Sequence, residues 1–183
     1  MKTVFVTGSR GFIGRRVCRE LAQLGATPIV IDRSDDVGRD DDGSLEVVVA
    51  DLANPGSALE RIADCHALID LAWDSLDNYN REGHFRHTLP LHYDFLKAAV
   101  DAGLPRVVGV GTCFEYGMRE GSLHESLVPD PQNAYAFAKH ALHVELELLR
   151  KAEEFQLTWV RPFYLYGSGS TRRSLYSILS DAV

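Results

Sequence analysis

A tyrosine and a lysine lie four residues apart in the segment AYAFAK (134–139), at the start of a predicted helix. Because positions four apart share one face of a helix, the phenol of Tyr135 and the ammonium of Lys139 can point into the same cleft. A free phenol titrates near pH ~10 and is a poor base at neutral pH, whereas a nearby ammonium favours the phenolate. The pair could therefore carry general acid–base chemistry, with an ordinary helix-surface pair as the alternative.

A third side chain that could join this chemistry is Thr112, in the segment GTCFEYG (111–117) after a predicted strand. Ligands of doubly wound sheets bind at the carboxyl ends of the strands, where this hydroxyl lies. The alternative is a strand-end hydroxyl that satisfies a local turn. The chemistry requires that a phenol, an ammonium and a hydroxyl from separate segments meet in the folded chain.

The segment TGSRGFIG carries three glycines between a predicted strand and a predicted helix, at the spacing G-x-x-G-x-x-G. Gly8 would permit the tight turn, Gly11 would let the backbone approach a pyrophosphate, and Gly14 would let the helix pack closely on the strand. The helix N-terminus adds free N–H groups and a partial positive charge. The segment therefore predicts a dinucleotide site, with a plain glycine-rich turn as the alternative.

Asp32 ends the second predicted strand, in the position of a ribose-binding carboxylate. It could accept both hydrogen bonds from the adenosine ribose diol and would repel a 2′-phosphate, which favours NAD. Arg33 beside it could receive that phosphate instead, so NADP remains an alternative. Asp51 and Leu52 follow the third predicted strand and could border the adenine, or Asp51 could cap the next helix.

The elements that must position these residues alternate between strand and helix. Predicted strands cover 2–7, 27–32, 46–51, 67–72, 106–111 and 157–162; predicted helices cover 11–24, 54–63, 84–102 and 134–155. Nearly unbroken apolar strands alternating with helices indicate a parallel sheet covered on both faces. Right-handed crossovers then give an α/β doubly wound parallel sheet, the Rossmann fold, as a single domain over residues 1–183. An acidic loop over 35–43 and a final helix that begins after residue 172 complete the prediction.

Composition and charge restrict the class of protein. The 183 residues are 45% hydrophobic and 25% charged, which is ordinary for a globular chain. The net charge of −7 argues against a nucleic-acid or anionic-membrane surface. Three scattered cysteines give no disulfide framework or zinc spacing, and the N-terminus does not resemble a signal peptide. We therefore expect a soluble cytoplasmic protein with neither a membrane span nor a metal.

Histidines gather in two places without the spacing of a metal site. We expect His84, His87 and His92 to be polar surface residues, and His140 and His143 to face solvent or a partner. Pro90, inside the predicted helix 84–102, would fit a first helical turn or kink the helix.

The ordered set of motifs resembles the extended short-chain dehydrogenase/reductases, in the NAD-dependent epimerase/dehydratase group that acts on nucleotide sugars. The similar segments are TGSRGFIG, Asp32, DL at 51–52, LIDLAW at 68–73, GTCFEYG, YAFAK and RPFYLYG at 161–167. The resemblance implies Tyr135 as general acid/base, Lys139 as the group that binds the nicotinamide ribose and lowers the phenol pKa, and Thr112 as the hydrogen-bond partner of the reacting oxygen. The implied cofactor contacts are Gly8, Arg10, Gly11, Phe12, Ile13, Gly14, Asp32, Arg33, Asp51, Leu52, Leu71, Ala72, Tyr135, Lys139 and Pro162.

The chain also departs from that family's pattern. Cys113 and Phe114 stand where dehydratase members carry an acidic pair, so the resemblance implies epimerisation or 4-keto reduction of a nucleotide sugar rather than dehydration. A non-catalytic dinucleotide-binding sensor or scaffold, and a reductase of a small carbonyl compound, are the alternatives. Helices 84–102 and 134–155 match those that pair in homodimers of the family. Residues 168–183 are expected to begin a substrate-binding portion that is largely absent from this chain.

Overall fold

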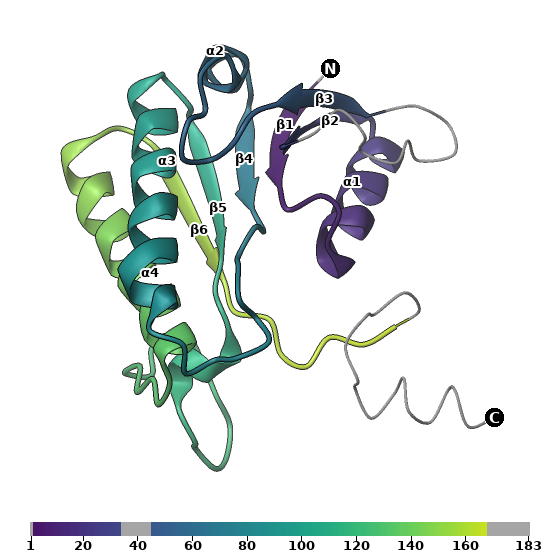
Figure 1. Cartoon of the computed structure of the whole chain (residues 1–183). Helices are drawn as coiled ribbons and strands as arrows, with labels where there is room; N and C mark the ends of the chain where they lie inside the picture. The colour runs from purple at the N-terminus through teal and green to yellow at the C-terminus, as the bar shows by residue number, and fades with distance from the viewer. Residues whose placement is uncertain (1, 34–44, 168–183) are drawn as a thin grey trace.

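The computed structural model describes residues 2–33 and 45–167, which build one sheet of six parallel strands in the order β3-β2-β1-β4-β5-β6 (Figure 1). The strands are β1 (Lys2–Thr7), β2 (Ala26–Asp32), β3 (Glu46–Val49), β4 (Ala67–Asp70), β5 (Arg106–Val110) and β6 (Gln156–Val160). The chain runs outward from β1 to β3 and then returns to β4 on the other side of β1. This order confirms the predicted doubly wound sheet, and its switch point lies between the carboxyl ends of β1 and β4.

Helices cover the sheet from both sides. They are α1 (Phe12–Gln23), α2 (Ala58–Ala63), α3 (Leu89–Asp101) and α4 (Ala134–Ala152), with a π-helical turn η1 (His84–Thr88) and a 3-10 turn η2 (Cys113–Tyr116). Figure 1 shows α3 and α4 side by side on one face and α1 on the other. Among the described residues, the helices lack the combination of length and hydrophobicity that a bilayer span requires.

Side-chain alternation along β1 divides the core into two layers. Phe5 is fully buried in the cluster under α3 and α4, whereas Val4 and Val6 belong to the cluster under α1. Successive residues of a strand point to opposite faces, so a strand buried on both faces must be apolar at every position. The continuous apolar run of this segment therefore follows directly from its central place in the sheet.

Most predicted elements are confirmed, with shifts at their ends. The helix predicted over 54–63 begins at Ala58, because the backbone of 51–58 forms turns that include a hydrogen bond from Ala58 N to Pro55 O. The helix predicted over 84–102 is divided into η1 and α3, and Pro90 occupies the first turn of α3 as expected. The acidic loop 35–43 and the final segment 168–183 lie outside the described residues.

Candidate functional site

Hydrogen bonds of one buried hydroxyl connect the end of β1, just before the glycine turn, to the segment after β4. Thr7 Oγ1 donates to Asp70 Oδ1 at 2.7 Å and accepts from the backbone N–H groups of Leu71 and Ala72, each at 3.0 Å. Thr7 and Asp70 are also partners in the parallel register of β1 and β4. The predicted cofactor residues Leu71 and Ala72 thus lie at the switch point of the sheet, beside Gly8.

Close backbone approach explains two of the three glycines. Gly8 has φ +68°, and a Cβ on it would lie 2.7 Å from Ala72 N. A Cβ on Gly14 would collide with the carbonyl oxygen of Gly8. Gly11 is the N-cap residue of α1 and has no side chain that could bond the first N–H groups of the helix. The first turn of α1 also carries no acidic residue. The N–H groups at the start of α1 therefore remain suited to an anion such as a diphosphate.

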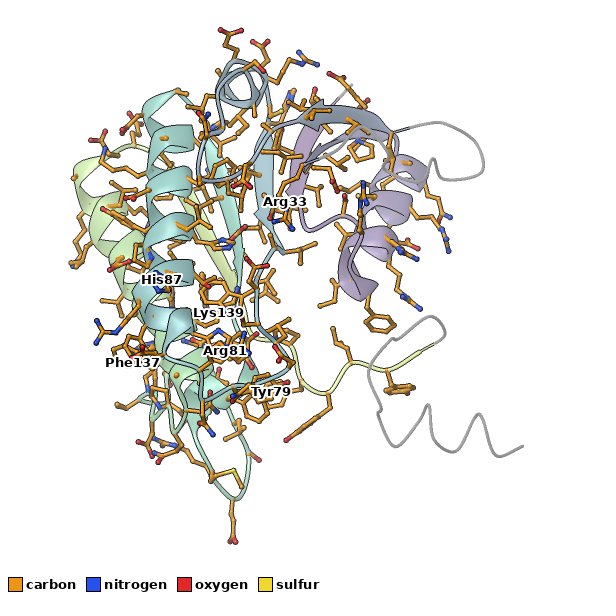
Figure 2. The ribbon with its side chains drawn as sticks, in the orientation of Figure 1. Arg33, Tyr79, Arg81, His87, Phe137 and Lys139 are labelled. Atoms are coloured by element: carbon orange, nitrogen blue, oxygen red, sulfur yellow. The ribbon has the colours of Figure 1, made fainter. Side chains whose placement is uncertain are left out.

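The carboxylate predicted to bind ribose is held by an arginine of the glycine turn. Arg10 Nε lies 2.7 Å from Asp32 Oδ2, and the Asp32 side chain is 17% exposed. Arg33 is exposed at the end of β2 and is labelled in Figure 2. The structure therefore brings Arg10 and Asp32 together at the adenosine end of the predicted site.

Three further predicted cofactor residues make local contacts within the chain: Asp51, Leu52 and Pro162. Asp51 Oδ1 accepts from Ala53 N at 2.9 Å, so this carboxylate stabilises the turn after β3 rather than capping α2, which follows Ser57. Leu52 packs against the core cluster under α3. Pro162 lies beside η2, where its carbonyl accepts from Cys113 N at 3.2 Å.

Lys139, labelled in Figure 2, is a buried lysine of α4. The residue is 3% exposed, and its Nζ lies 3.9 Å from the centroid of the Trp73 ring. Burial lowers the pKa of this ammonium to about 8, although the negative charges of Asp70 and Glu115 act in the opposite direction. Asn133 caps α4 by accepting from Ala136 N, which fixes the start of the helix one turn before Lys139.

Tyr135 lies in an aromatic cluster at the start of α4. Its ring stacks on Tyr79 with centroids 5.2 Å apart and meets Trp73 edge-on at 6.1 Å. Its backbone N–H also donates to Tyr79 O at 2.9 Å. Tyr79 in turn lies 5.4 Å from the ring of Phe114 in η2, so it joins the segment of Thr112 to the segment of Tyr135.

Thr112 has the turn role that the sequence left open. Its Oγ1 accepts from Phe114 N at 3.3 Å, and its N–H donates to Glu115 Oε1 at 2.9 Å, which together form a capping box for η2. The residue is 6% exposed. A hydroxyl oxygen can accept one bond and still donate its proton, so this role is compatible with the predicted contact to a reacting oxygen.

Two of the histidines expected on the surface are buried, so that prediction is wrong for them. His84 is 0% exposed, with Nδ1 accepting from Trp73 Nε1 at 3.1 Å and Nε2 donating to Asn78 O at 3.0 Å. His92 is 2% exposed and donates from Nδ1 to Asp70 Oδ2 at 2.8 Å. His87 is exposed, as predicted. The buried partners come from β4 and the loop after it, and helical spacing alone gives no sign of them.

Asp70 is a buried carboxylate that sequence reasoning passed over. It is 1% exposed and accepts from both Thr7 and His92. Burial alone would raise the pKa of Asp70, but His92, Lys139 and the hydrogen bond from Thr7 together hold that pKa below its ordinary value. A charged residue inside the apolar run LIDLA was the signal that a buried polar network would be found there.

A second buried network ties η2 to the end of β6. Glu115 is 0% exposed and accepts from Arg161 Nε at 2.8 Å and Trp159 Nε1 at 3.2 Å. His143 stacks on Trp159 with centroids 4.7 Å apart and lies 3.3 Å from Arg161 Nη2. The His143 side chain is 21% exposed, so it packs one face on the aromatic ring that β6 supplies and stays partly open to solvent.

The same network contains a group of potential metal ligands. One ligand atom from each of Glu115, His140 and His143 falls within a span of 4.8 Å. The guanidinium of Arg161 already bonds Glu115 and contacts His143, so a positive charge occupies the centre of the group. Burial and the Arg161 charge also lower the pKa of His143. The arrangement is that of an ion-pair network between η2, α4 and β6.

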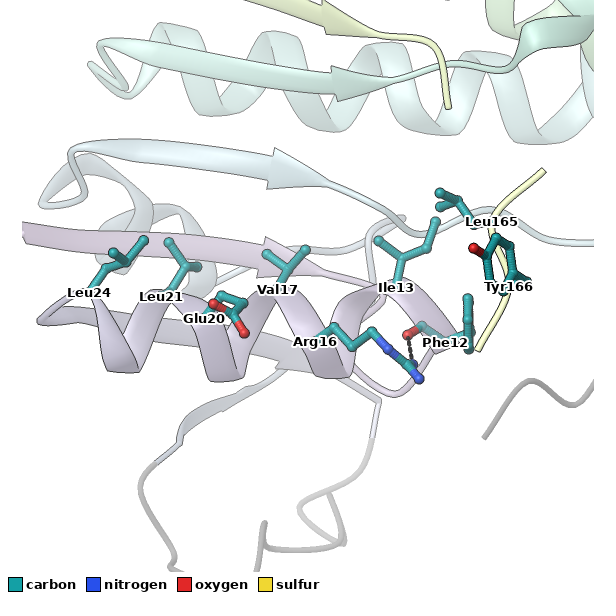
Figure 3. A pocket seen from close by; sticks show the side chains of 9 residues that line it. All are labelled: Phe12, Ile13, Arg16, Val17, Glu20, Leu21, Leu24, Leu165 and Tyr166. Atoms are coloured by element: carbon teal, nitrogen blue, oxygen red, sulfur yellow. Dashed lines mark hydrogen bonds between the residues drawn. The ribbon is translucent and has the colours of Figure 1, made fainter. Parts of the chain in front are cut away.

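A separate apolar pocket of about 310 Å³ lies along α1 (Figure 3). It is lined by Phe12, Ile13 and further α1 residues, with Leu165 and Tyr166 from the end of the described chain. The dashed line in Figure 3 marks the bond from Arg16 Nη1 to Phe12 O, at 2.9 Å. The side chains of the predicted cofactor residues Phe12 and Ile13 therefore face this pocket. Neither Tyr135 nor Lys139 lines it.

Comparisons with known proteins match this chain to one protein family and to several relatives. The family model described as "NAD dependent epimerase/dehydratase family" matches residues 4–183. The chain is 24% identical over 182 residues to a dTDP-6-deoxy-L-talose 4-dehydrogenase (NAD(+)) of Aggregatibacter actinomycetemcomitans, covering 98% of this chain and 67% of that protein. It is 31% identical over 174 residues to a ceramide reductase of Caulobacter vibrioides (strain NA1000 / CB15N), covering 92% of this chain and 48% of that protein.

Among solved structures, MoeE5 in complex with UDP-glucose and NAD matches with a TM-score of 0.81 and 27% identity. The match covers 98% of this chain and 60% of that chain. The chain therefore spans about half to two thirds of the length of these relatives, between 48% and 67%.

Proposed function

The chain belongs to the NAD-dependent epimerase/dehydratase family, and from this premise we propose that it carries the NAD site and the acid–base residues of an enzyme that modifies a nucleotide sugar. The reaction proposed is oxidoreduction at a sugar hydroxyl or ketone, as epimerisation or 4-keto reduction. The observation that carries the proposal is the placement of Tyr135 and Lys139 at one end of the sheet with a glycine turn suited to diphosphate.

For the cofactor, we propose that the start of α1 binds the diphosphate through free backbone N–H groups. Asp32 would accept hydrogen bonds from the adenosine ribose, with Arg10 as the counter-ion that keeps this carboxylate in place. The carboxylate favours NAD over NADP, because it would repel a 2′-phosphate. Gly8 and Gly14 support this assignment, since a side chain at Gly8 would strike the backbone of Leu71 and Ala72, and one at Gly14 would strike the backbone of the turn.

For the chemistry, we propose that Tyr135 takes or gives the proton at the reacting sugar oxygen. Lys139, one helical turn later, would stabilise the phenolate by its charge, and Thr112 would hydrogen-bond the same oxygen. The nicotinamide ring supplies the hydride acceptor or donor when the cofactor is bound. Because the pKa of Lys139 is lowered to about 8, activity should fall as pH rises through that value and the ammonium is lost.

For the substrate, two similarities support a nucleotide sugar. The talose relative is by name a 4-dehydrogenase of a dTDP-sugar, and the MoeE5 structure holds UDP-glucose. Cys113 and Phe114, which cannot act as an acidic pair, support oxidoreduction over dehydration. A second candidate is reduction of a carbonyl on a non-sugar substrate, favoured by the 31% identity to a ceramide reductase.

For assembly, we propose a homodimer through the helices 84–102 and 134–155. Phe137, Val144 and Leu148 of α4 are 51%, 44% and 57% exposed, at a spacing of seven and four residues that places them on one helical face. Phe137 also packs edge-on against Phe85 of η1, with centroids 6.0 Å apart. A change of Leu148→Asp should lower the dimer fraction in sedimentation equilibrium, whereas Leu24→Asp, at an exposed leucine of the α1 side, should leave it unchanged.

For the compartment, we propose the cytoplasm. Cys18, Cys65 and Cys113 are all free, and the first two are buried. Free thiols suit a reducing compartment, where disulfides are rare.

Two measurements test the function. Calorimetric titration with NAD and NADP measures cofactor binding and choice, and a turnover assay measures 4-keto reduction or epimerisation on a panel of dTDP- and UDP-sugars. Tyr135→Phe should abolish turnover and retain NAD binding, while Tyr93→Phe, which removes a hydroxyl from a half-buried tyrosine of α3, should retain both. Turnover by Tyr135→Phe at the wild-type rate would refute the acid–base assignment. NAD binding without turnover of any sugar or carbonyl substrate would support a sensor or scaffold instead.

A further inference from the structure

Trp73 contacts both side chains that we assign to acid–base chemistry on α4. Lys139 Nζ lies over its ring at 3.9 Å from the centroid, and the Tyr135 ring meets it edge-on at 6.1 Å. The residue directly follows Leu71 and Ala72, whose N–H groups bond Thr7. The backbone that carries the indole is therefore anchored beside the glycine turn.

Two buried histidines fix the orientation of this indole. Asn78 O accepts from His84 Nε2 at 3.0 Å, which makes His84 Nδ1 the acceptor for Trp73 Nε1 at 3.1 Å. His92 also packs against the indole, with ring centroids 4.9 Å apart. A rotation of the ring would break the bond to His84, so the face presented to Lys139 is held in place.

The Lys139 ammonium needs this aromatic face because it is taken out of water. The residue is 3% exposed, and its Nζ donates no hydrogen bond to residues 2–33 and 45–167. The negative face of an indole attracts a cation within about 6 Å, most strongly where water is excluded. The ring thus replaces part of the hydration that burial removes.

We propose that Trp73 is the positioning residue of the site: its ring, locked by His84, holds Lys139 as a cation next to Tyr135. Trp73 acts through Lys139 and is therefore not itself catalytic. The consequence for turnover rests on the proposed function, whereas the effect on the charge of Lys139 does not.

Other titratable groups lie around Lys139, Trp73 and Tyr135. They are Asp70 of β4, His84 of η1, His92 of α3, Glu115 of η2, Tyr135 of α4 and Tyr79 of the loop before η1. Asp70 and Glu115 favour the charged lysine, while burial disfavours it. A test must therefore change the ring and leave these groups intact.

Direct titration of Lys139 by NMR provides such a test, because the chain has four lysines: Lys2, Lys97, Lys139 and Lys151. With lysine labelled at Cε, the signal missing from Lys139→Met identifies the residue. In Trp73→Leu the Lys139 pKa should fall by about one unit, the size expected for loss of a desolvated cation–π contact. Trp73→Phe, which retains an aromatic face, should recover at least half of that shift.

A second form of this titration uses fluorinated tryptophan, which leaves the packing of the ring unaltered. Fluorine weakens the negative face of the ring with little change in shape, so the Lys139 pKa should fall stepwise from unlabelled to singly to triply fluorinated protein. The matched control is Trp73→Phe grown on the same amino acids, in which the fluorine reaches only Trp159 and the pKa should not move. A Lys139 pKa that is independent of fluorination would overturn the proposal, even if Trp73→Leu fails to fold.

Kinetics separate this inference from the proposed function. If both hold, the high-pH limb of kcat in Trp73→Leu should move to lower pH by the same amount as the Lys139 pKa, with a smaller change in Trp73→Phe. A pKa shift without any turnover in the wild type would retain the role of Trp73 and refute the proposed function. An unchanged Lys139 pKa in an active wild type would refute the role of Trp73 alone.

Discussion

Replacement of Asp70 by asparagine removes one negative charge from the buried network, together with the oxygen that accepts from His92. Asp70 is 1% exposed, and its two oxygens accept from Thr7 and His92 at 2.7 and 2.8 Å. Asparagine keeps the shape and the acceptor for Thr7, but it removes a buried negative charge that favours the Lys139 ammonium. Breaking a buried charge pair costs ~3–5 kcal/mol, and the retained hydrogen bond favours the lower end, about 3 kcal/mol. For a chain of this size that corresponds to a fall in Tm of roughly 6–12 °C.

The effect should depend on pH in a defined direction. The folded-state pKa of Asp70 lies below its ordinary value of 3.8, so its carboxylate stabilises the fold above that pH. This stabilisation is lost as pH falls through the folded-state pKa, where a protonated aspartate resembles asparagine. The gap between wild type and Asp70→Asn should therefore be full at pH 7 and should narrow only below about pH 4.

Urea denaturation of both proteins between pH 7 and pH 3 measures this gap. Asp101→Asn is the matched control, since Asp101 pairs with Lys97 at 2.6 Å on the surface of α3, with side chains 48% and 42% exposed. An exposed pair of this kind contributes at most about 1 kcal/mol, so the control should lose far less stability. A loss in Asp70→Asn no larger than that in Asp101→Asn would refute the view that β4 carries a buried, charge-paired carboxylate.

Three further changes test other parts of the site. Gly14→Ala should lower NAD affinity at least tenfold in calorimetry, because the new Cβ would strike Gly8 O and displace the turn; an unchanged affinity would contradict the close approach. Glu115→Gln should cost about 3 kcal/mol in urea denaturation, because it removes the fully buried anion that pairs with the Arg161 guanidinium, and wild-type stability would contradict an ion pair at this position. Turnover should decline as pH rises through about 8, the pKa of Lys139, and a rate that stays constant to pH 10 would exclude a role for its charge.

The pattern of strands and helices could be predicted from the sequence because each local rule agreed with the fold. Apolar runs such as 4–6 lie at the centre of the sheet and are buried on both faces, so they contain no polar alternation to confuse their assignment. Glycines at 8 and 14 were predictable because a strand, a turn and a helix in close packing leave no space for a side chain. Element ends were less certain, as the turns before α2 illustrate.

The polar network around the site was not predictable in the same way. The absence of a metal-site spacing predicts surface positions for His84 and His92, yet both are buried. Asp70, the partner of His92, is the last residue of β4. Trp73, the partner of His84, follows Ala72 in the segment after that strand. A buried imidazole is stable only with partners for its nitrogens, and the identity of those partners depends on which strand the helix crosses.

The sequence by itself determined the sheet, the glycine turn and the presence of a tyrosine and a lysine on one helical face, since these depend on spacing within single segments. Tertiary structure decided what surrounds that pair. It placed Trp73 over Lys139, buried Asp70 beside His92, and used Thr112 and Glu115 to close η2 against Arg161. The charge state of a buried group depends on the dielectric and the charges that distant segments bring to it, and no spacing along the chain encodes those distances.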